Sequence, residues 1–303
     1  ADLDRIMTSF FRKLSGADDK DFLVNCFVTT RESDDADRRL ARISEDLVER
    51  LRPMQEALDD ELTRLLERAR STQRNEFVLI VGTKGAGKST FIDRFFSHVL
   101  QREIASQCVP IRLNLADSDG SELNVVDWMS RNLVRLLEEV ALGGAPTYEQ
   151  LQGIFFSEYQ RLSTGPFRHL YETDKVKFKI LFGEKIDKLR TDEPHEYACL
   201  ILHDIVRSRK KIPCLVLDNA DHFTVEFQER VFQFARSVYE KQLCLVIMPI
   251  TDRTSWHLSQ EGALRSFENE VFYLPTPPTR AILDRRIDYI RGKVGTEKGE
   301  KGT

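Results

Sequence analysis

The chain has 303 residues, of which 41% are hydrophobic and 31% are charged, and its 45 basic and 49 acidic side chains leave a net charge of −4. This composition is typical of a globular protein with one large domain or two smaller ones. The charge balance excludes a general attraction to nucleic acid, although a local basic face is compatible with it. No apolar run approaches the roughly 20 residues of a membrane span, and the N-terminus lacks the pattern of a signal peptide. We therefore expect a cytoplasmic protein without membrane association.

The cysteines do not indicate a metal site or a disulfide framework, because they are odd in number, widely spaced and never in CxxC spacing. They are Cys26, Cys108, Cys199, Cys214 and Cys244. Most of them lie in apolar runs, which predicts small core residues of a reduced protein.

Residues 1–75 are expected to form a helical N-terminal extension. The apolar residues of 1–16 share one helical face, and the acidic residues among the basic ones favour a packing helix over a membrane-surface helix. Phe22–Thr30 is predicted to be a short strand, and residues 34–70 a long charged helix in which Pro53 causes a kink or starts a new helix. The apolar stripe of this helix either packs on its own domain or mediates dimerisation.

From Glu76 onward, apolar strands alternate with amphipathic helices. The strands are expected at residues 77–81, 109–115, 212–218, 243–251 and 270–274, and the helices at 89–100, 123–140, 197–209 and 226–241. Continuous apolar strands separated by helices predict an α/β fold with a doubly wound, parallel five-stranded sheet covered on both faces. This domain spans residues 76–291, with a helical insertion near 147–190, and a flexible tail is expected over 292–303.

The segment between the first strand and the helix that follows it matches a phosphate-binding motif. Residues 82–89 read GTKGAGKS and satisfy G-x-x-x-x-G-K-[ST], the P-loop pattern, between a buried strand and an amphipathic helix. Glycines allow backbone conformations that turn successive N–H groups toward one point, and the helix N-terminus adds its positive end. The predicted nucleotide-binding residues are Gly82, Thr83, Lys84, Gly85, Ala86, Gly87, Lys88, Ser89 and Thr90.

Three of these residues have side chains with expected roles. Lys88 is predicted to reach the β- and γ-phosphates, Ser89 to coordinate Mg²⁺, and Thr90 to bond an α-phosphate oxygen. The cofactors predicted by this motif are therefore a nucleoside triphosphate and Mg²⁺.

The strand ending in LVLDNAD supplies a partner for the metal. Asp218 follows four apolar residues, as in the Walker B pattern, and is predicted to hold Mg²⁺ beside Ser89 through a water molecule. Many hydrolysing P-loop ATPases have a glutamate at the next position, where this chain has Asn219. Asp221, Glu226 or a residue of a neighbouring subunit could activate water instead; otherwise hydrolysis is slow and the protein acts as a nucleotide-held switch.

Asp221 has a second interpretation of equal weight, because together with Thr224 it could cap the following helix.

The strand before Thr251 ends at the sheet edge where ligands bind in doubly wound folds. Thr251 is therefore predicted to position water or sense the γ-phosphate, and Arg253 to bond that phosphate. The alternative for Arg253 is a surface ion pair with Asp252 or Glu240.

Other motifs restrict the ligand. Residues 117–120, DSDG, resemble a GTPase motif, but no guanine-reading Asn/Thr-Lys-x-Asp follows, so we interpret DSDG as a turn and the nucleotide as ATP. The basic segments RSRKK (207–211) and KVKFKI (175–180) are weak candidates for nucleic-acid contact. The first is favoured as a solvated helix end, and the second has no cluster of stacking aromatics beside it.

Taken together, GTKGAGKST, LVLDNAD and LVIMPITDR, followed by VFYLPTPPTRAILDRRIDYI, resemble the AAA+ and STAND branch of P-loop ATPases over residues 77–291. DNAD is also similar to the corresponding motif of KAP-type bacterial ATPases. The resemblance implies the strand order 5-1-4-3-2 with the nucleotide at the switch point. It also implies oligomerisation, for which Arg280, Arg285 and Arg286 are candidate arginine donors to a neighbouring subunit.

By this resemblance the leading hypothesis is an ATP-binding and ATP-hydrolysing switch of the STAND or KAP type that oligomerises with ATP and controls an effector protein, with prokaryotic antiviral defence as a setting. The first alternative is an AAA+ ATPase that acts on DNA in loading, replication or transposition. The second is a nucleotide-dependent scaffold with little hydrolysis. The candidate partners are therefore further copies of the chain, an effector protein and nucleic acid.

Overall fold

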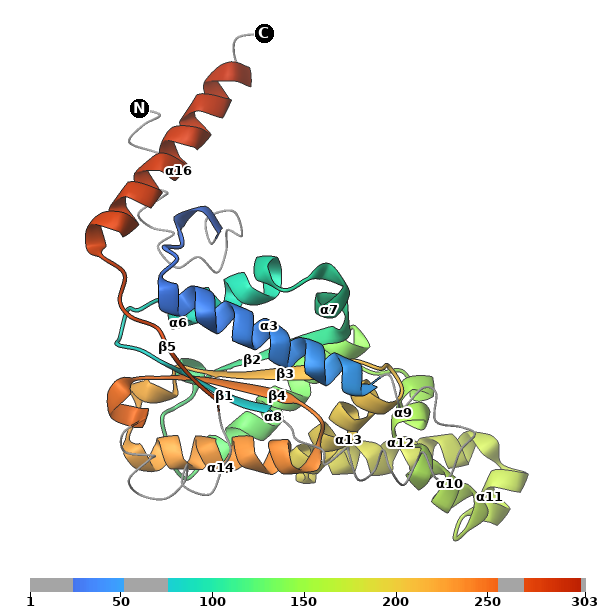
Figure 1. The fold of residues 1–303 in the computed structure, drawn as a ribbon. Coiled ribbons are helices and arrows are strands. Elements are labelled where there is room, and N and C mark those ends of the chain that lie inside the picture. Colours follow the sequence, from blue (N-terminus) through green and yellow to red (C-terminus); the bar gives the residue numbers. More distant parts are fainter. Residues whose placement is uncertain (1–23, 52–75, 256–269, 301–303) are drawn as a thin grey trace, which may run out of the picture.

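The computed structural model describes residues 24–51, 76–255 and 270–300 (Figure 1). The predicted helix over residues 1–16, the kink at Pro53 and the continuation of the long charged helix beyond Leu51 lie outside the described residues. Within the described residues, none of the helices combines the length and the apolarity that a membrane crossing requires.

The core of the fold is a five-stranded, all-parallel sheet in the order β2-β3-β4-β1-β5. Its strands are β1 Glu76–Val81, β2 Cys108–Asn114, β3 Ile212–Asp218, β4 Leu245–Ile250 and β5 Glu270–Tyr273. β3 and β4 are buried along their whole length, as expected of strands covered on both faces. Both the predicted α/β fold and the predicted strand order, read from the other edge, are confirmed.

Helices cover both faces of this sheet (Figure 1). One face packs on α8 Val125–Leu137, α13 Pro194–Arg207 and α14 Val225–Lys241; the other packs on α3 Arg31–Leu51, α6 Lys88–Arg94 and α7 Arg102–Gln107. The side chains of β1 alternate between the two layers, since Phe77 and Leu79 join the first and Val78 and Ile80 the second. All five cysteines are buried and none of them forms a disulfide, which confirms that they are core residues.

Two of the predicted helices change geometry near their ends. The helix after β1 continues from α6 as the π-helical segment η2 Phe95–Val99, and α8 continues as the π-helical segment η4 Glu138–Leu142. The second ends at Gly143, whose positive φ of 80° suits a helix C-cap.

The segment between α8 and α13 is helical, as predicted. It contains α9 Tyr148–Ile154, α10 Phe156–Thr164, α11 Arg168–Thr173 and α12 Lys175–Asp192, and lies at one end of the sheet layers (Figure 1). Arg190 donates two hydrogen bonds to the buried Glu138, at 2.7 and 2.8 Å, and the Tyr197 hydroxyl donates a third at 3.2 Å. These bonds connect α12 to η4 and α13.

The predicted strand over Phe22–Thr30 is wrong for its described part. Residues 24–26 are helical, residues 27–30 have no regular secondary structure, and α3 begins at Arg31. Two causes account for this difference: a local hydrogen-bond motif and tertiary packing. Thr30 and Ser33 exchange side-chain-to-backbone hydrogen bonds of 2.9 and 3.1 Å that start a helix, and Phe27 packs beside Phe91 of α6 instead of joining a sheet.

Residues 292–300 of the predicted flexible tail are helical, because α16 Thr279–Glu300 is a continuous helix (Figure 1). The lysines and glutamates after Arg291 favour a helix that has already started, although Gly292, Gly295 and Gly299 do not.

Candidate functional site

The phosphate-binding motif forms the turn between β1 and α6, at the carboxyl ends of the strands. The Gly82 amide donates to the Ile250 carbonyl of β4 at 3.2 Å, and the Leu274 amide donates to the Val81 carbonyl at 2.8 Å. The hydroxyls of Thr83 and Thr276 lie 2.6 Å apart. The turn is therefore fixed between the ends of β4 and β5, where doubly wound sheets bind ligands.

The glycines of this turn have two different functions. Gly85 and Gly87 have φ of 87° and 85°, and no heavy atom lies within 4 Å of the place where a Cβ would stand, so the space beside them is open for a ligand. A Cβ on Gly82 would instead lie 2.6 Å from the Leu274 carbonyl oxygen. Gly82 is thus needed for close packing against the end of β5, and its φ is not positive.

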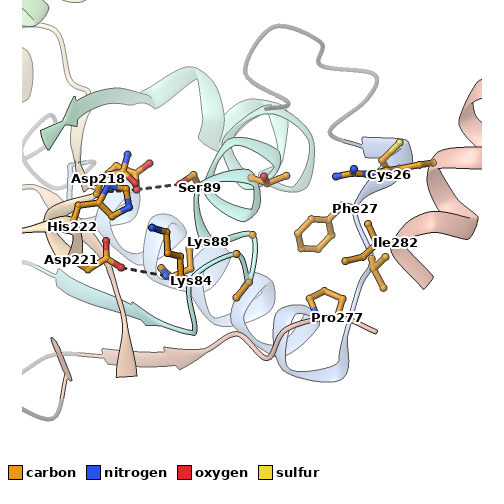
Figure 2. Close-up of a pocket in the computed structure, with 17 residues that line it drawn as sticks. Cys26, Phe27, Lys84, Lys88, Ser89, Asp218, Asp221, His222, Pro277 and Ile282 are labelled. Carbon is orange, nitrogen blue, oxygen red and sulfur yellow. Dashed lines mark hydrogen bonds and ion pairs between the residues drawn. The ribbon is translucent and has the colours of Figure 1, made fainter. Parts of the chain in front are cut away.

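Lys88 is held within the turn by acceptors of its own chain. Its ammonium donates to the carbonyls of Gly82 at 2.9 Å and Thr83 at 3.3 Å, and it forms an ion pair with Asp221 at 3.6 Å (Figure 2). The side chains of Lys88 and Asp221 are only 11% and 8% exposed. Asp221 therefore lies at the phosphate end of the site, and its observed partner is the lysine.

Ser89 and Asp218 are 129 residues apart in the sequence and were predicted to share a metal ion. The fold brings their side chains together. The Ser89 hydroxyl donates to Asp218 Oδ1 at 3.2 Å, and the Asn219 amide donates to the same oxygen at 3.0 Å (Figure 2). A hydroxyl and a carboxylate are oxygen donors of the kind that Mg²⁺ takes in nucleotide sites. Together with the open space at Gly85 and Gly87, this donor set fits a magnesium-bound nucleotide.

Arg112 of β2 lies close to Asp218, and it was not predicted from the sequence. Its guanidinium forms hydrogen bonds and ion pairs with both carboxylate oxygens of Asp93, at 3.0 and 2.8 Å, and its Nε lies 3.9 Å from Asp218 Oδ2. Burial raises the pKa of the Asp93 carboxyl, and Arg112 opposes this shift. The only sequence signal for Arg112 was a charged residue within an apolar strand.

Asn219 adopts a left-handed conformation with φ of 64°, which asparagine tolerates better than most residues. Its side-chain amide donates to Asn114 Oδ1 at 2.7 Å, and Asn114 in turn donates to Asp117 at 3.0 Å. A carboxamide held in this way is a poor general base, because it does not take up a proton near neutral pH.

Asp221 and Thr224 were predicted to cap the following helix together, and the observed N-cap is Thr224. The Thr224 hydroxyl accepts from the Phe227 amide at 3.3 Å and is the N-cap of α14. Glu226, the other candidate for water activation, is not among the described residues that line the pocket.

The phosphate-binding turn of residues 82–89, called the cradle from here on, opens into a pocket of about 350 Å³. The far end of this pocket is apolar. The residues of this end are Cys26, Phe27, Val28, Pro277 and Ile282, and Arg286 also lines the pocket (Figure 2). The Arg94 guanidinium lies over the Phe27 ring at 4.4 Å and also pairs with Asp37 of α3. The N-terminal segment is thereby attached to α6, the helix that carries Lys88.

Sequence reasoning missed most of this apolar wall and His222, which lines the pocket beside Asp221. Residues 26–28 were assigned to a strand, so their place over the cradle was not foreseen. Arg286, a candidate donor to a neighbouring subunit, lines the pocket of its own chain, whereas Arg280 and Arg285 are exposed.

Thr251 and Arg253 are not among the described residues that line the pocket. The Thr251 hydroxyl lies 3.1 Å from that of Thr254, and Arg253 is exposed. The surface alternative is not observed either among the described residues, since Glu240 pairs with Arg236 at 2.6 Å. The sensor roles of Thr251 and Arg253 stay predictions.

No curated protein matches the chain. A family model described as AAA ATPase domain matches residues 53–247, more than half of the chain and the whole segment from the cradle to the middle of β4. The chain therefore belongs to the AAA ATPase domain family, and it is a P-loop nucleoside triphosphatase of the AAA+ type with ATPase activity.

Proposed function

We propose that the protein is a slow ATPase that works as a nucleotide-controlled switch. ATP would lie with its phosphates at Lys88 and the turn amides and its base against the apolar end of the pocket, where Phe27 and Ile282 face each other (Figure 2). Ser89 and Asp218 would hold Mg²⁺, which supplies charge neutralisation at the β- and γ-phosphates.

The observation that carries this proposal is Asn219. The position that would place a water-activating carboxylate directly after Asp218 is occupied by an amide hydrogen-bonded to Asn114 at 2.7 Å. A protein that binds ATP well but activates water poorly remains in its ATP-bound state for a long time. That property suits a switch better than a motor.

The finer assignment rests on the resemblance of PITDR and LPTPPT to the STAND and KAP branch, and is supported as an analogy only. In this proposal ATP binding favours an assembled state that controls an effector protein, with Thr251 and Arg253 sensing the γ-phosphate. Prokaryotic antiviral defence is the proposed setting.

Single-turnover hydrolysis tests the proposal. With enzyme in excess over Mg²⁺-ATP, the wild type should bind ATP but convert it well below the ~10 s⁻¹ typical of enzymes. Asn219→Glu should raise the rate of conversion at least about tenfold, because it supplies a general base. Lys88→Ala should lose ATP binding and shows that turnover arises at this site. Fast wild-type turnover, or no gain from Asn219→Glu, would refute the slow switch.

A DNA-acting ATPase is the second candidate, favoured by the start of α12. Val176 and Ile180 are 71% and 57% exposed there, among the exposed Lys175, Lys177 and Lys179. This function predicts that DNA raises ATP turnover and that DNA binding weakens steeply with salt.

A further inference from the structure

Two carboxylates at the end of β3 each hold one chemical group of the cradle. Asp218 accepts the Ser89 hydroxyl at 3.2 Å, and Asp221, three residues later, pairs with the Lys88 ammonium at 3.6 Å (Figure 2). The first contact leaves a hydroxyl and a carboxylate ready to hold Mg²⁺. The second opposes nucleotide binding, because it occupies the cation that phosphate requires.

The Lys88 ammonium faces three acceptor groups of its own chain in this arrangement. Two of its three N–H donors bond to the carbonyls of Gly82 and Thr83. The Asp221 carboxylate lies 3.6 Å from the ammonium and forms an ion pair that is longer than a hydrogen bond. Of these only Asp221 carries a charge. A phosphate oxygen that approaches Lys88 therefore competes with this carboxylate for the same cation, at close range and with little water around the pair.

The backbone that carries Asp221 is held by its neighbours, so we expect the longer lysine side chain to be the part that moves. Asp221 lies in the 3₁₀ turn η5 Ala220–His222, which follows the left-handed Asn219. Ala220 is fully buried, and the side-chain amide of Asn219 is bonded to Asn114. Lys88, by contrast, has four rotatable side-chain bonds and can leave its carboxylate for a phosphate.

We propose that Asp221 is an autoinhibitory residue that competes with the β- and γ-phosphates for Lys88 and so sets the nucleotide affinity of the site. The inference rests on the proposed binding of ATP. Two effects act in the same direction: the nucleotide must break the Lys88–Asp221 pair, and the carboxylate then remains close to the phosphates and repels them. The same competition makes the nucleotide-free state more stable and the bound state less so.

The test compares Asp221→Asn with the wild type and with Asp127→Asn, which removes an equal charge from the exposed pair with Arg131 outside the pocket. Binding of ATP, ADP and AMP is measured by calorimetry with Mg²⁺, and melting temperature is measured without nucleotide. Asp221→Asn should bind ATP and ADP between about 3- and 10-fold more tightly, and AMP unchanged, because the single phosphate of AMP does not reach Lys88. Its nucleotide-free melting temperature should fall, and Asp127→Asn should match the wild type in every assay.

The opposite signs separate competition from a merely structural role. If Asp221 only supports the turn, its loss should lower both stability and ATP affinity, and that result would overturn the inference, as would an unchanged ATP affinity. Asp221→Ala is the second variant should Asp221→Asn fail to fold, with the same expected gain in ATP affinity. A wild type that binds ATP while both variants show no gain refutes this inference alone, whereas a wild type that binds no ATP refutes the proposed function itself.

Discussion

At the end of β3, two single residues, Asp218 and Asn219, determine which chemical steps the site can support. Asp218 is 5% exposed and receives hydrogen bonds from the Ser89 hydroxyl and the Asn219 amide, so its orientation is determined before any metal arrives. The next side chain points away to Asn114. At the end of β3, Asp218 is therefore suited to position a metal ion, whereas Asn219 is not suited to activate water.

His195 at the start of α13 gives a prediction on pH dependence. Burial lowers its pKa, the nearby Lys241 acts in the same direction, and Glu196 opposes both. The unfolded pKa is about 6.5. Because the folded pKa lies lower, the contribution of neutral His195 is complete above about pH 6.5 and is lost as pH falls through 6.5 toward the folded value.

Urea unfolding between pH 8 and pH 5 checks this. The wild-type free energy of unfolding should decrease more steeply on acidification than that of His195→Gln, which cannot be protonated. Equal slopes for the two proteins would show that His195 is not the responsible group.

Individual site residues were predictable where the chemistry is contiguous in the chain. Lys88 and Ser89 follow from one eight-residue pattern, and Asp218 follows because an apolar strand ends in an acid. Arg112 and Phe27 were not predictable, since each acts through a neighbour from another element: Asp93 and Asp218 for the first, Arg94 for the second. The Lys88–Asp221 pair was missed for the same reason, although both residues were assigned to the site.

At the scale of elements, the turn between β1 and α6 depends on the end of β5. Gly82→Ala should lower the free energy of unfolding by roughly 1–3 kcal/mol, because the new Cβ would lie 2.6 Å from the Leu274 carbonyl oxygen and 3.2 Å from the Ala86 Cβ. Gly183→Ala is the matched control: it lies within α12 with no heavy atom within 4 Å of its Cβ position. This change should stabilise by about 0.5–1 kcal/mol.

Denaturant unfolding of the two variants measures both effects. A Gly82→Ala variant as stable as the wild type would show that the turn and the end of β5 separate at little cost.

Strands of the sheet were predicted within one or two residues, because most of them are apolar runs bounded by turns, which leave few alternatives. The segment Phe22–Thr30 has a similar composition, but its described residues 24–30 are not a strand, since the edge next to β1 is already taken by β5 and Thr30 starts α3. Propensity alone does not record which edges are occupied.

At the scale of the whole molecule, the segments that enclose the nucleotide pocket come from both ends of the described chain. Residues 26–28 precede α3, and Pro277, Ile282 and Arg286 lie before or within α16. α16 then extends away from the sheet layers (Figure 1). Leu283 and Ile287 on this helix are 49% and 44% exposed. A nucleotide in the pocket would therefore contact the segment before α3 and the start of α16. A shift of either one would change the outer surface of the protein.

The most direct test of an ATP-controlled switch is the mass of the protein in solution, measured by light scattering with and without Mg²⁺-ATP, for the wild type and for Lys88→Ala. The account predicts that ATP raises the wild-type mass to a multiple of the chain mass and leaves Lys88→Ala unchanged. A wild type that binds ATP without any change in mass, or a Lys88→Ala variant that assembles like the wild type, would contradict it.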